Sequence, residues 1–257
     1  MSDVTDIRNM FRGATSFDQD LGDWDVSSVT QASGVFDNSA MSIENLDATL
    51  SGWSDVETSA GETRQMNVEV GAAGLMYTDA TAVNHLETEY GWTFTGMTLD
   101  TDSAWVGTDA GLDYTADPAA PNVIHYHGLG GDDIIRATSR NEHFYGGTGD
   151  DIYVLGGGID TIHLRYTNEG FDRVAGFLAG QDMIDISLLL DGYVEGVSDI
   201  NNYVTAVIDP DDNRDSIFHI DANGDGSGTD VSIQIAFLTF ETTLVDDFVA
   251  NGSFILV

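Results

Sequence analysis

Large apolar residues recur at a fixed distance in the N-terminal third of the chain. Phe11 recurs as Phe36 after 25 residues, and Trp24 recurs as Trp53 after 29. A repeat of about 20–29 residues is typical of solenoids in which each turn buries its apolar face against the next. The pattern predicts a solenoid of about two repeats. Because solenoids need about three repeats to be stable, we expect a capping segment, or a chain that is part of a longer protein.

Two apolar stripes with helical spacing follow this repeat. The first begins after Ser42, a favourable N-cap residue, and the second begins at Thr78 or Asp79 and ends at Gly91. Their apolar members are Ile43, Leu46, Leu50 and Trp53 in the first stripe and Ala82, Val83, Leu86 and Tyr90 in the second. The spacing predicts two amphipathic helices that pack on the solenoid and cap it.

The same region resembles a known repeat family. The segment VTDIRNMFRGATSFDQDLGDWDVSSVTQASGVF resembles the BspA-like leucine-rich repeat of bacterial surface proteins. The segments ATLSGW and GAAGLMYTDATAVNHLETEYGWTFTG are similar to the part that closes such arrays, so the resemblance covers residues 2–96. Thr78 departs from it, because many relatives carry cysteine there. The resemblance implies a surface-exposed binding or spacer domain rather than a catalytic one.

A nine-residue pattern occupies the middle of the chain. It is visible in HGLGGDDII, GGTGDDIYV and LGGGIDTIH, with a degraded copy, ATSRNEHFY, after the first. In each copy a glycine stands two residues before an acid, and an apolar residue stands two residues after it. The triads are Gly130/Asp132/Ile134, Gly149/Asp151/Tyr153, Gly158/Asp160/Ile162 and Gly170/Asp172/Val174, and the degraded copy places Glu142 and Phe144 at the acid and apolar positions.

This spacing predicts stacked turns with oxygen ligands on one side and a core on the other. Glycine permits a tight turn with positive φ, and the apolar residue faces inward from a short strand. Carboxylates and inward carbonyl groups are the oxygen ligands that Ca²⁺ prefers, and such nonapeptides form calcium-binding parallel β-helices. A set of glycine- and aspartate-rich hairpin loops is the alternative.

The nonapeptides resemble the calcium β-roll of RTX proteins, and that resemblance implies a stacking order and a ligand set. Turns would stack alternately, so Asp132 would pair with Asp151, Glu142 with Asp160, and the turn of Asp151 with that of Asp172. Carbonyl ligands would come from the second and fourth positions of each turn, namely Gly128, Gly130, Gly147, Gly149, Gly156 and Gly158. The degraded turn offers Thr138 and Arg140 there, and a guanidinium beside a dication lowers affinity unless it points away.

The remaining segments complete the predicted organisation. We expect a linker or a first strand at residues 97–122, the roll at 123–175 and a β-rich domain at 176–257. The last segment resembles the C-terminal domain of proteins exported by type I secretion, which implies a type I exporter as partner and an uncleaved C-terminal signal. Alternation of Val231, Ile233, Ile235 and Phe237 predicts a half-buried strand.

A loop before that strand has a second calcium-like pattern. Asp221, Asn223 and Asp225 match the first half of an EF-hand loop, but Ser232 stands where the bidentate glutamate belongs. A hairpin turn is the first interpretation of this loop. A weaker calcium site that uses these three residues and Asp230 is the second.

Composition restricts the partners. Aspartate and glutamate number 44 against 8 arginines and lysines, a net charge of −36, and cysteine is absent. Such a chain repels nucleic acid and anionic membranes and attracts divalent cations, although an acidic surface of the halophilic kind is an alternative. The first residues lack the features of a secretory signal peptide, and no apolar stretch approaches the about 20 residues of a membrane span.

Catalytic motifs are missing from the sequence. It contains no HExxH, GxSxG or Walker motif, and the only metal alternative is a zinc pair of His125 and His127. We therefore expect a mainly β, non-enzymatic protein that is secreted or held at the cell surface, with a solenoid presented by a calcium roll. An adhesin for a cell-surface, glycan or protein ligand is the first functional hypothesis. A self-assembling surface-layer or matrix protein and the tail of a secreted enzyme are the alternatives.

Overall fold

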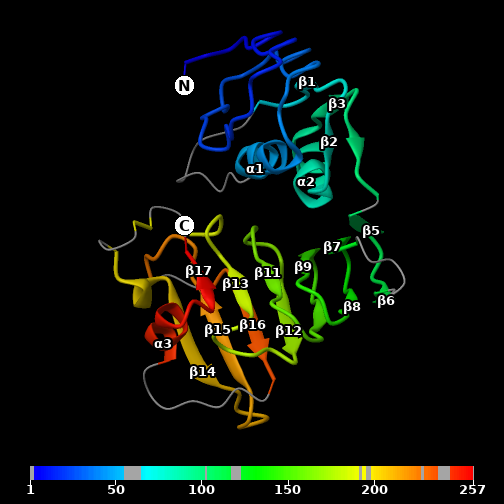
Figure 1. Cartoon of the computed structure of the whole chain (residues 1–257). Coiled ribbons are helices and arrows are strands. Elements are labelled where there is room, and N and C mark those ends of the chain that lie inside the picture. Colours follow the sequence, from blue (N-terminus) through cyan, green and yellow to red (C-terminus); the bar gives the residue numbers. More distant parts are fainter. Residues whose placement is uncertain are drawn as a thin grey trace. The chain divides into compact units, whose positions relative to one another are not determined.

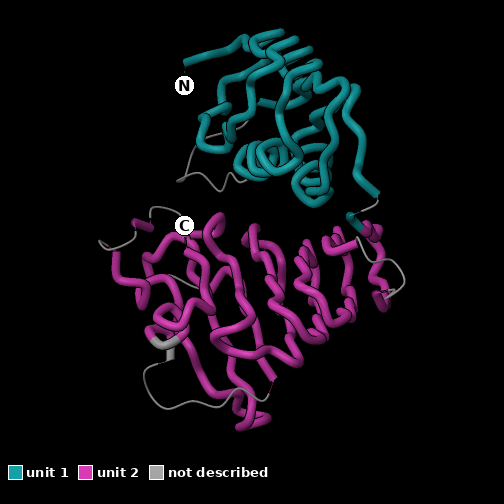
Figure 2. The backbone as a smooth tube through the Cα atoms, viewed as in Figure 1, with its two compact units in different colours: residues 1–104 teal, residues 105–257 magenta. Residues whose placement is uncertain are grey.

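The computed structural model describes residues 3–54, 65–101, 103–116, 123–190, 193–194, 198–226, 229–236 and 244–256. Within these ranges the chain divides into two units, residues 1–104 and 105–257, which Figure 2 colours separately. No helix in the described ranges is both long enough and apolar enough to cross a bilayer. Phe237 lies outside the described residues, as do Pro118 and Pro121 in the segment expected as a linker.

Two helices of unit 1 form where the apolar stripes predict them. The second helix begins after Asp79, whose carboxylate accepts the N–H of Ala82, and ends at Gly91 in the left-handed conformation. Both helices bury one apolar face, which confirms their prediction from spacing alone. The elements of unit 1 are α1 Ile43–Ser54, β1 Glu69–Gly71, β2 Met76–Tyr77, α2 Ala80–Tyr90, β3 Thr93–Thr95 and β4 Thr98–Leu99.

Backbone ladders between successive repeats hold unit 1 together (Figure 1). In the described part of unit 1, four chain segments run parallel to one another, near residues 6–13, 31–38, 70–74 and 93–96. Only the first two carry the repeated sequence pattern. The segment expected as a cap therefore adds two further levels to the solenoid as well as a helix.

An aromatic column fills the interior of unit 1. The ring centroids of Phe11 and Phe36 lie 6.1 Å apart, those of Phe36 and Trp53 5.7 Å, and those of Trp53 and Trp92 6.3 Å. Each ring belongs to a different level or to the helix beside it, so the column links the repeats. Large apolar side chains of this kind each contribute about 1.5–3 kcal/mol when buried.

Unit 2 is built from two facing sheets whose strands are parallel, apart from antiparallel pairs at one edge of the larger sheet. One sheet has the strand order β14-β15-β16-β12-β10-β8-β6, and the other has the order β17-β13-β11-β9-β7-β5. The bounds are β5 Ala104–Thr108, β6 Asp113–Thr115, β7 His125–Gly130, β8 Ile134–Arg136, β9 His143–Thr148, β10 Ile152–Val154, β11 Thr161–His163, β12 Phe171–Ala175, β13 Met183–Asp185, η1 Ile200–Asn202, β14 Val204–Ile208, β15 Ser216–Ile220, β16 Val231–Ile235, α3 Leu244–Ala250 and β17 Phe254–Ile255. The mainly β fold with a parallel solenoid is confirmed.

Strands on both sides of the nonapeptides extend the same two sheets (Figure 1). β5 and β6, in the segment expected as a linker or a first strand, lie at the edge of each sheet beyond β7 and β8. β16 and β17 continue the sheets after β12 and β13, and one apolar core runs through all of them. The predicted alternation in β16 is confirmed, because Val231, Ile233 and Ile235 are buried and the residues between them are not.

Candidate metal-binding rows

Acidic residues occupy the same level in successive stacked turns. β10 lies parallel between β8 and β12, and β11 lies parallel between β9 and β13, so each turn stacks on the next but one, as predicted. The acids at or just before the start of these strands form two rows, one along each sheet. The first carboxylate row consists of Asp133, Asp151, Glu169 and Asp172, and the second carboxylate row consists of Glu142, Asp160 and Asp182.

The predicted register of the first turn is wrong by one residue. Ile134 pairs with Ile152, which makes Asp133 and not Asp132 the partner of Asp151. Asp133 is buried, whereas Asp132 is exposed and accepts the N–H of Asp150 at 3.0 Å. Adjacent residues of an extended chain point to opposite sides, so the doublet of acids offers only one inward carboxylate.

The carbonyl positions of this turn shift by the same single residue. Leu129 pairs with Gly147, so Leu129 and Gly131 stand level with Gly147 and Gly149, in place of the expected Gly128 and Gly130. Leu129, Gly131, Gly147 and Gly149 all have positive φ, and Leu129 at 78° adopts a conformation that usually requires glycine. This left-handed backbone is what turns the carbonyl groups at these positions.

Carbonyl oxygens of one turn press against glycines of the next turn in the same sheet. A Cβ atom at Gly147 would overlap the carbonyl oxygen of Leu129, and one at Gly149 would lie 2.5 Å from that of Gly131. On the other sheet, Gly156 and Gly158 meet the carbonyl oxygens of Thr138 and Arg140 in the same way. Only glycine fits at these four positions. Main-chain carbonyl oxygens therefore line the turns on both sheets.

Each buried aspartate of the first carboxylate row accepts a main-chain N–H from the turn before it. Asp151 Oδ1 accepts the N–H of Asp133 at 2.8 Å, and Asp172 Oδ1 accepts that of Asp151 at 3.0 Å. Asp133 Oδ1 accepts the N–H of Leu112 at 2.7 Å. One oxygen of each aspartate is therefore committed to aligning the turns.

In three of these four acids, one oxygen has no hydrogen-bond partner. Oδ2 of Asp133, Oδ2 of Asp151 and Oε2 of Glu169 are buried and accept no hydrogen bond. Burial raises the pKa of Asp133 to about 6, that of Asp151 to about 7 and that of Glu169 to about 8. Burial and the neighbouring Glu169 raise the pKa of Asp172 well above its ordinary value. An ionised carboxylate in such a place needs a positive charge beside it, and Arg165 supplies one near Glu169.

The donor set of the first row fits a hard divalent cation. Among the described residues, no three acidic or imidazole side chains converge on one point, so a ligand set made of side chains alone is absent there. A Cβ atom at Gly128 would overlap both Oδ2 of Asp133 and the carbonyl oxygen of Gly146, so carboxylate and main-chain oxygens come together there. Oxygen donors from both sources, at about 2.3–2.6 Å, are the ligands that Ca²⁺ takes.

The oxygens of the second carboxylate row are better satisfied. Asp160 Oδ1 accepts the N–H of Glu142 at 3.0 Å, and Asp182 accepts those of Asp160 and Leu178 at 3.0 and 2.8 Å. Burial raises the pKa of Asp160 to about 7. The side-chain amide of Gln181 donates to the carbonyl oxygen of Gly158, one of the expected ligands.

The histidines stack on the outer face of the sheet formed by β7, β9 and β11. The rings of His125 and His127, the alternative zinc pair, have centroids 6.5 Å apart. His143 Nδ1 lies 3.0 Å from His163 Nε2, and His163 Nδ1 lies 2.9 Å from Asp185 Oδ2. Burial and the neighbouring His163 lower the pKa of His143 to about 3. This chain of contacts belongs to no metal-binding group found among the described residues.

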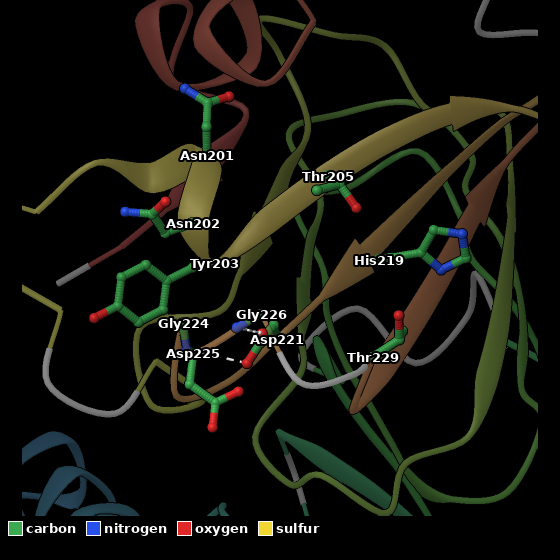
Figure 3. Close-up of a pocket in the computed structure, with 10 residues that line it drawn as sticks. All are labelled: Asn201, Asn202, Tyr203, Thr205, His219, Asp221, Gly224, Asp225, Gly226 and Thr229. Carbon is green, nitrogen blue, oxygen red and sulfur yellow. Dashed lines mark hydrogen bonds between the residues drawn. The ribbon is translucent and has the colours of Figure 1, made fainter.

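The EF-hand-like loop is a hairpin turn between the antiparallel strands β15 and β16. Both carboxylate oxygens of Asp221 accept N–H groups of the loop itself, from Gly224 at 3.0 Å and Gly226 at 2.8 Å, as Figure 3 shows. Asn223 Oδ1 accepts the N–H of Asp225 at 3.0 Å. The hairpin interpretation is confirmed. Use of Asp221, Asn223 and Asp225 as calcium ligands stays a prediction.

A polar cavity of about 350 Å³ lies beside this loop (Figure 3). Its walls come from η1, the start of β14, the end of β15 and the loop. The residues that line it are Asn201, Asn202, Tyr203, Thr205, His219, Asp221, Gly224, Asp225, Gly226 and Thr229.

Sequence reasoning missed three acids of the two rows. Asp133 could have been found by counting back nine residues from Glu142. Asp182 follows Asp160 by 22 residues because the turns after β11 are longer than nine, so the count fails there. Glu169 occupies a position that the nonapeptide pattern leaves unspecified, and no signal in the sequence marks it.

Comparisons with known proteins describe the two units separately. Residues 1–86 match the model of a family described as "Mycoplasma protein of unknown function, DUF285". A search of curated proteins found no match. Among solved structures, the chain is similar to the extracellular lipase LipA from Serratia marcescens, with 20% identity and a TM-score of 0.42 over 61% of this chain. The matched region spans 21% of the length of that lipase.

The family match and the fold together give a two-part description of the chain. The chain joins a repeat unit that matches the DUF285 family to a parallel β-solenoid with two rows of buried acids.

Proposed function

We propose that this chain is a secreted, calcium-dependent RTX-type surface protein without catalytic activity. In this proposal unit 2 folds on calcium outside the cell, and without calcium its folded state is only partly populated. Unit 1, the BspA-like repeat domain, is presented for binding to a cell-surface, glycan or protein ligand, as in an adhesin.

One observation carries the calcium part of the proposal. Asp133 and Asp151 each bury a carboxylate oxygen that accepts no hydrogen bond. A buried, unpaired charge costs several kcal/mol, and a dication between two turns would neutralise two carboxylates at once. The carbonyl groups that face the glycines of the next turn supply the remaining oxygen ligands.

Linkage explains how such rows would act as a folding switch. Without calcium, the ionised rows oppose stacking of the turns, which suits a chain that must cross an exporter unfolded. A cation that binds only the folded rows stabilises that state by RT ln(1 + [Ca²⁺]/Kd), about 2.7 kcal/mol at a hundredfold excess over Kd. The absence of cysteine and the surplus of acids, 44 against 8 basic residues, suit a location where calcium is abundant.

The direct test uses circular dichroism of the whole chain in EDTA, calcium and magnesium. We expect calcium to produce a cooperative gain of β signal and a higher melting temperature. Magnesium should not replace it, because Mg²⁺ demands a small octahedral shell and keeps its waters. Identical spectra and melting curves in EDTA and calcium would exclude a calcium-dependent fold.

Two further experiments address export and binding. Deletion of residues 190–257 should stop release through a matching type I exporter, whereas deletion of residues 1–96 should not. A glycan and peptide screen with and without calcium tests the adhesin role. Calcium-dependent growth of large particles in light scattering would instead favour a self-assembling matrix protein.

A further inference from the structure

The turn of Glu142 has its own means of neutralising a buried acid. Glu142 is fully buried, and its carboxylate accepts the N–H of Thr138 at 2.9 Å and the hydroxyl of Thr138 at 2.5 Å. The guanidinium of Arg140 lies 3.5 Å from the same carboxylate and also donates to the carbonyl oxygen of Val123 at 3.1 Å. The side chain of Arg140 is thereby anchored at two points and directed at Glu142.

The backbone of this turn also departs from that of its neighbours. The fourth position is a glycine with positive φ at Gly131, Gly149, Gly158 and Gly170. Arg140 occupies that position in the turn of Glu142 and is not among the residues with positive φ. The carbonyl oxygen of Arg140 nonetheless meets Gly158 as that of Gly131 meets Gly149, so the side chain at the fourth position is what distinguishes this turn.

The contrast with the first carboxylate row points to a division of roles. Oδ2 of Asp133 and Oδ2 of Asp151 accept no hydrogen bond, whereas both oxygens of Glu142 accept one. We infer that Arg140 is a tethered cation that takes the place of calcium in the turn of Glu142, so that this turn closes without metal. The inference rests on the proposed function, because it states which turn of a calcium roll is exempt.

Electrostatics makes the two cations mutually exclusive. A guanidinium remains charged at every accessible pH, and a dication bound by Glu142 would lie within a few ångströms of it. At that distance like charges repel strongly in a buried site, and Arg140 is held in place by Val123. Calcium therefore binds at Asp133 and Asp151 in preference to this turn.

Calorimetric titration with calcium tests the assignment. Glu142→Gln should bind as many calcium ions as the unaltered chain, with an affinity within about twofold. Asp151→Asn should bind at least one ion fewer. A loss of one ion in Glu142→Gln would overturn the inference, because it would make Glu142 a ligand.

A double-mutant cycle measured in EDTA gives a readout that does not depend on calcium binding. Arg140→Gln leaves the buried Glu142 without a counter-charge and should lower the melting temperature most. The double variant Arg140→Gln/Glu142→Gln should melt above Arg140→Gln alone, and Arg140→Lys should retain most of the stability. Additive effects of the two single changes would refute the tethered cation.

The two experiments separate failure of this inference from failure of the proposed function. If the chain binds no calcium at all, the calcium roll is refuted. The coupling between Arg140 and Glu142 in EDTA then decides the role of Arg140 by itself. Normal calcium binding without coupling refutes the tethered cation alone. If Arg140→Gln does not fold, the comparison of Arg140→Lys with the unaltered chain in EDTA still measures whether the positive charge suffices.

Discussion

Replacement of Asp151 by asparagine should change stability in opposite directions in EDTA and in calcium. Asp151 is 0% exposed, and burial raises its pKa from 3.8 to about 7. That difference corresponds to about 4 kcal/mol of cost to the folded state at neutral pH, since one pKa unit equals about 1.4 kcal/mol. Asparagine removes the charge and with it this cost.

The substitution keeps one interaction and introduces one defect. The amide oxygen can still accept the N–H of Asp133, which Asp151 Oδ1 accepts at 2.8 Å. The amide NH₂ would replace Oδ2, which has no hydrogen-bond partner, and a buried unsatisfied donor costs about 1–3 kcal/mol. We therefore expect Asp151→Asn to stabilise the chain by about 1–3 kcal/mol in EDTA at pH 7.5 and to lose much of the stabilisation by calcium.

Urea unfolding with and without calcium measures both effects, and Asp150→Asn is the matched control. Asp150 is the exposed neighbour of Asp151, and its Oδ1 accepts the N–H of Phe171 at 2.9 Å, an acceptor role that an amide oxygen preserves. It should change stability by less than about 0.5 kcal/mol in both buffers. Equal destabilisation by Asp151→Asn in EDTA and in calcium would contradict the reasoning, as would an effect of Asp150→Asn of the same size.

Further predictions concern pH, a glycine and the two units. In EDTA the free energy of unfolding should fall as pH rises from about 4 to about 8, because the raised pKa values of Asp151 and Glu169 let the folded chain bind more protons than the unfolded chain in this range. With calcium, the melting temperature should depend less on pH. Gly149→Ala should lower the free energy of unfolding by at least about 2 kcal/mol and weaken calcium binding, because its Cβ would strike a carbonyl group. Gly157→Ala is the control: its Cβ would have its nearest contact at 3.9 Å, so unfolding and calcium titration should both be almost unchanged. Trp105→Phe removes the one tryptophan of unit 2 and leaves Trp24, Trp53 and Trp92 in unit 1. Because unit 1 should fold without calcium, the fluorescence emission of this variant should be the same in EDTA and in calcium.

The elements that the sequence predicted are those with a local cause. Helix α2 follows from apolar spacing, the cap at Asp79 and the stop at Gly91, all within one short segment. Strand β16 follows from alternation over five residues. The alternate stacking of the turns was implied by family resemblance, and the strand pairs confirm it.

The parts that were missed depend on contacts between distant segments. The two extra levels of unit 1 carry none of the repeated residues, and they exist because main-chain groups pair with the level before them. Phe36 donates to the carbonyl oxygen of Gly71 at 2.9 Å, and Ala72 donates to that of Thr95 at 2.9 Å. Backbone pairing of this kind is almost independent of side-chain identity, so a search for repeated residues cannot detect it.

The surplus of acids had two competing interpretations, a solvated surface and a set of ligands, and the structure shows why composition cannot separate them. Asp132 and Asp150 are exposed, while their neighbours Asp133 and Asp151 are fully buried. The two kinds of acid are adjacent in sequence and chemically identical. Only the direction in which the backbone turns each side chain distinguishes them, and that direction is set by the pairing of strands 18 residues apart. The exposed carboxylates remain hydrated and also accept main-chain N–H groups. A buried carboxylate that ionises needs a counter-charge, such as the guanidinium of Arg140 that lies 3.5 Å from Glu142.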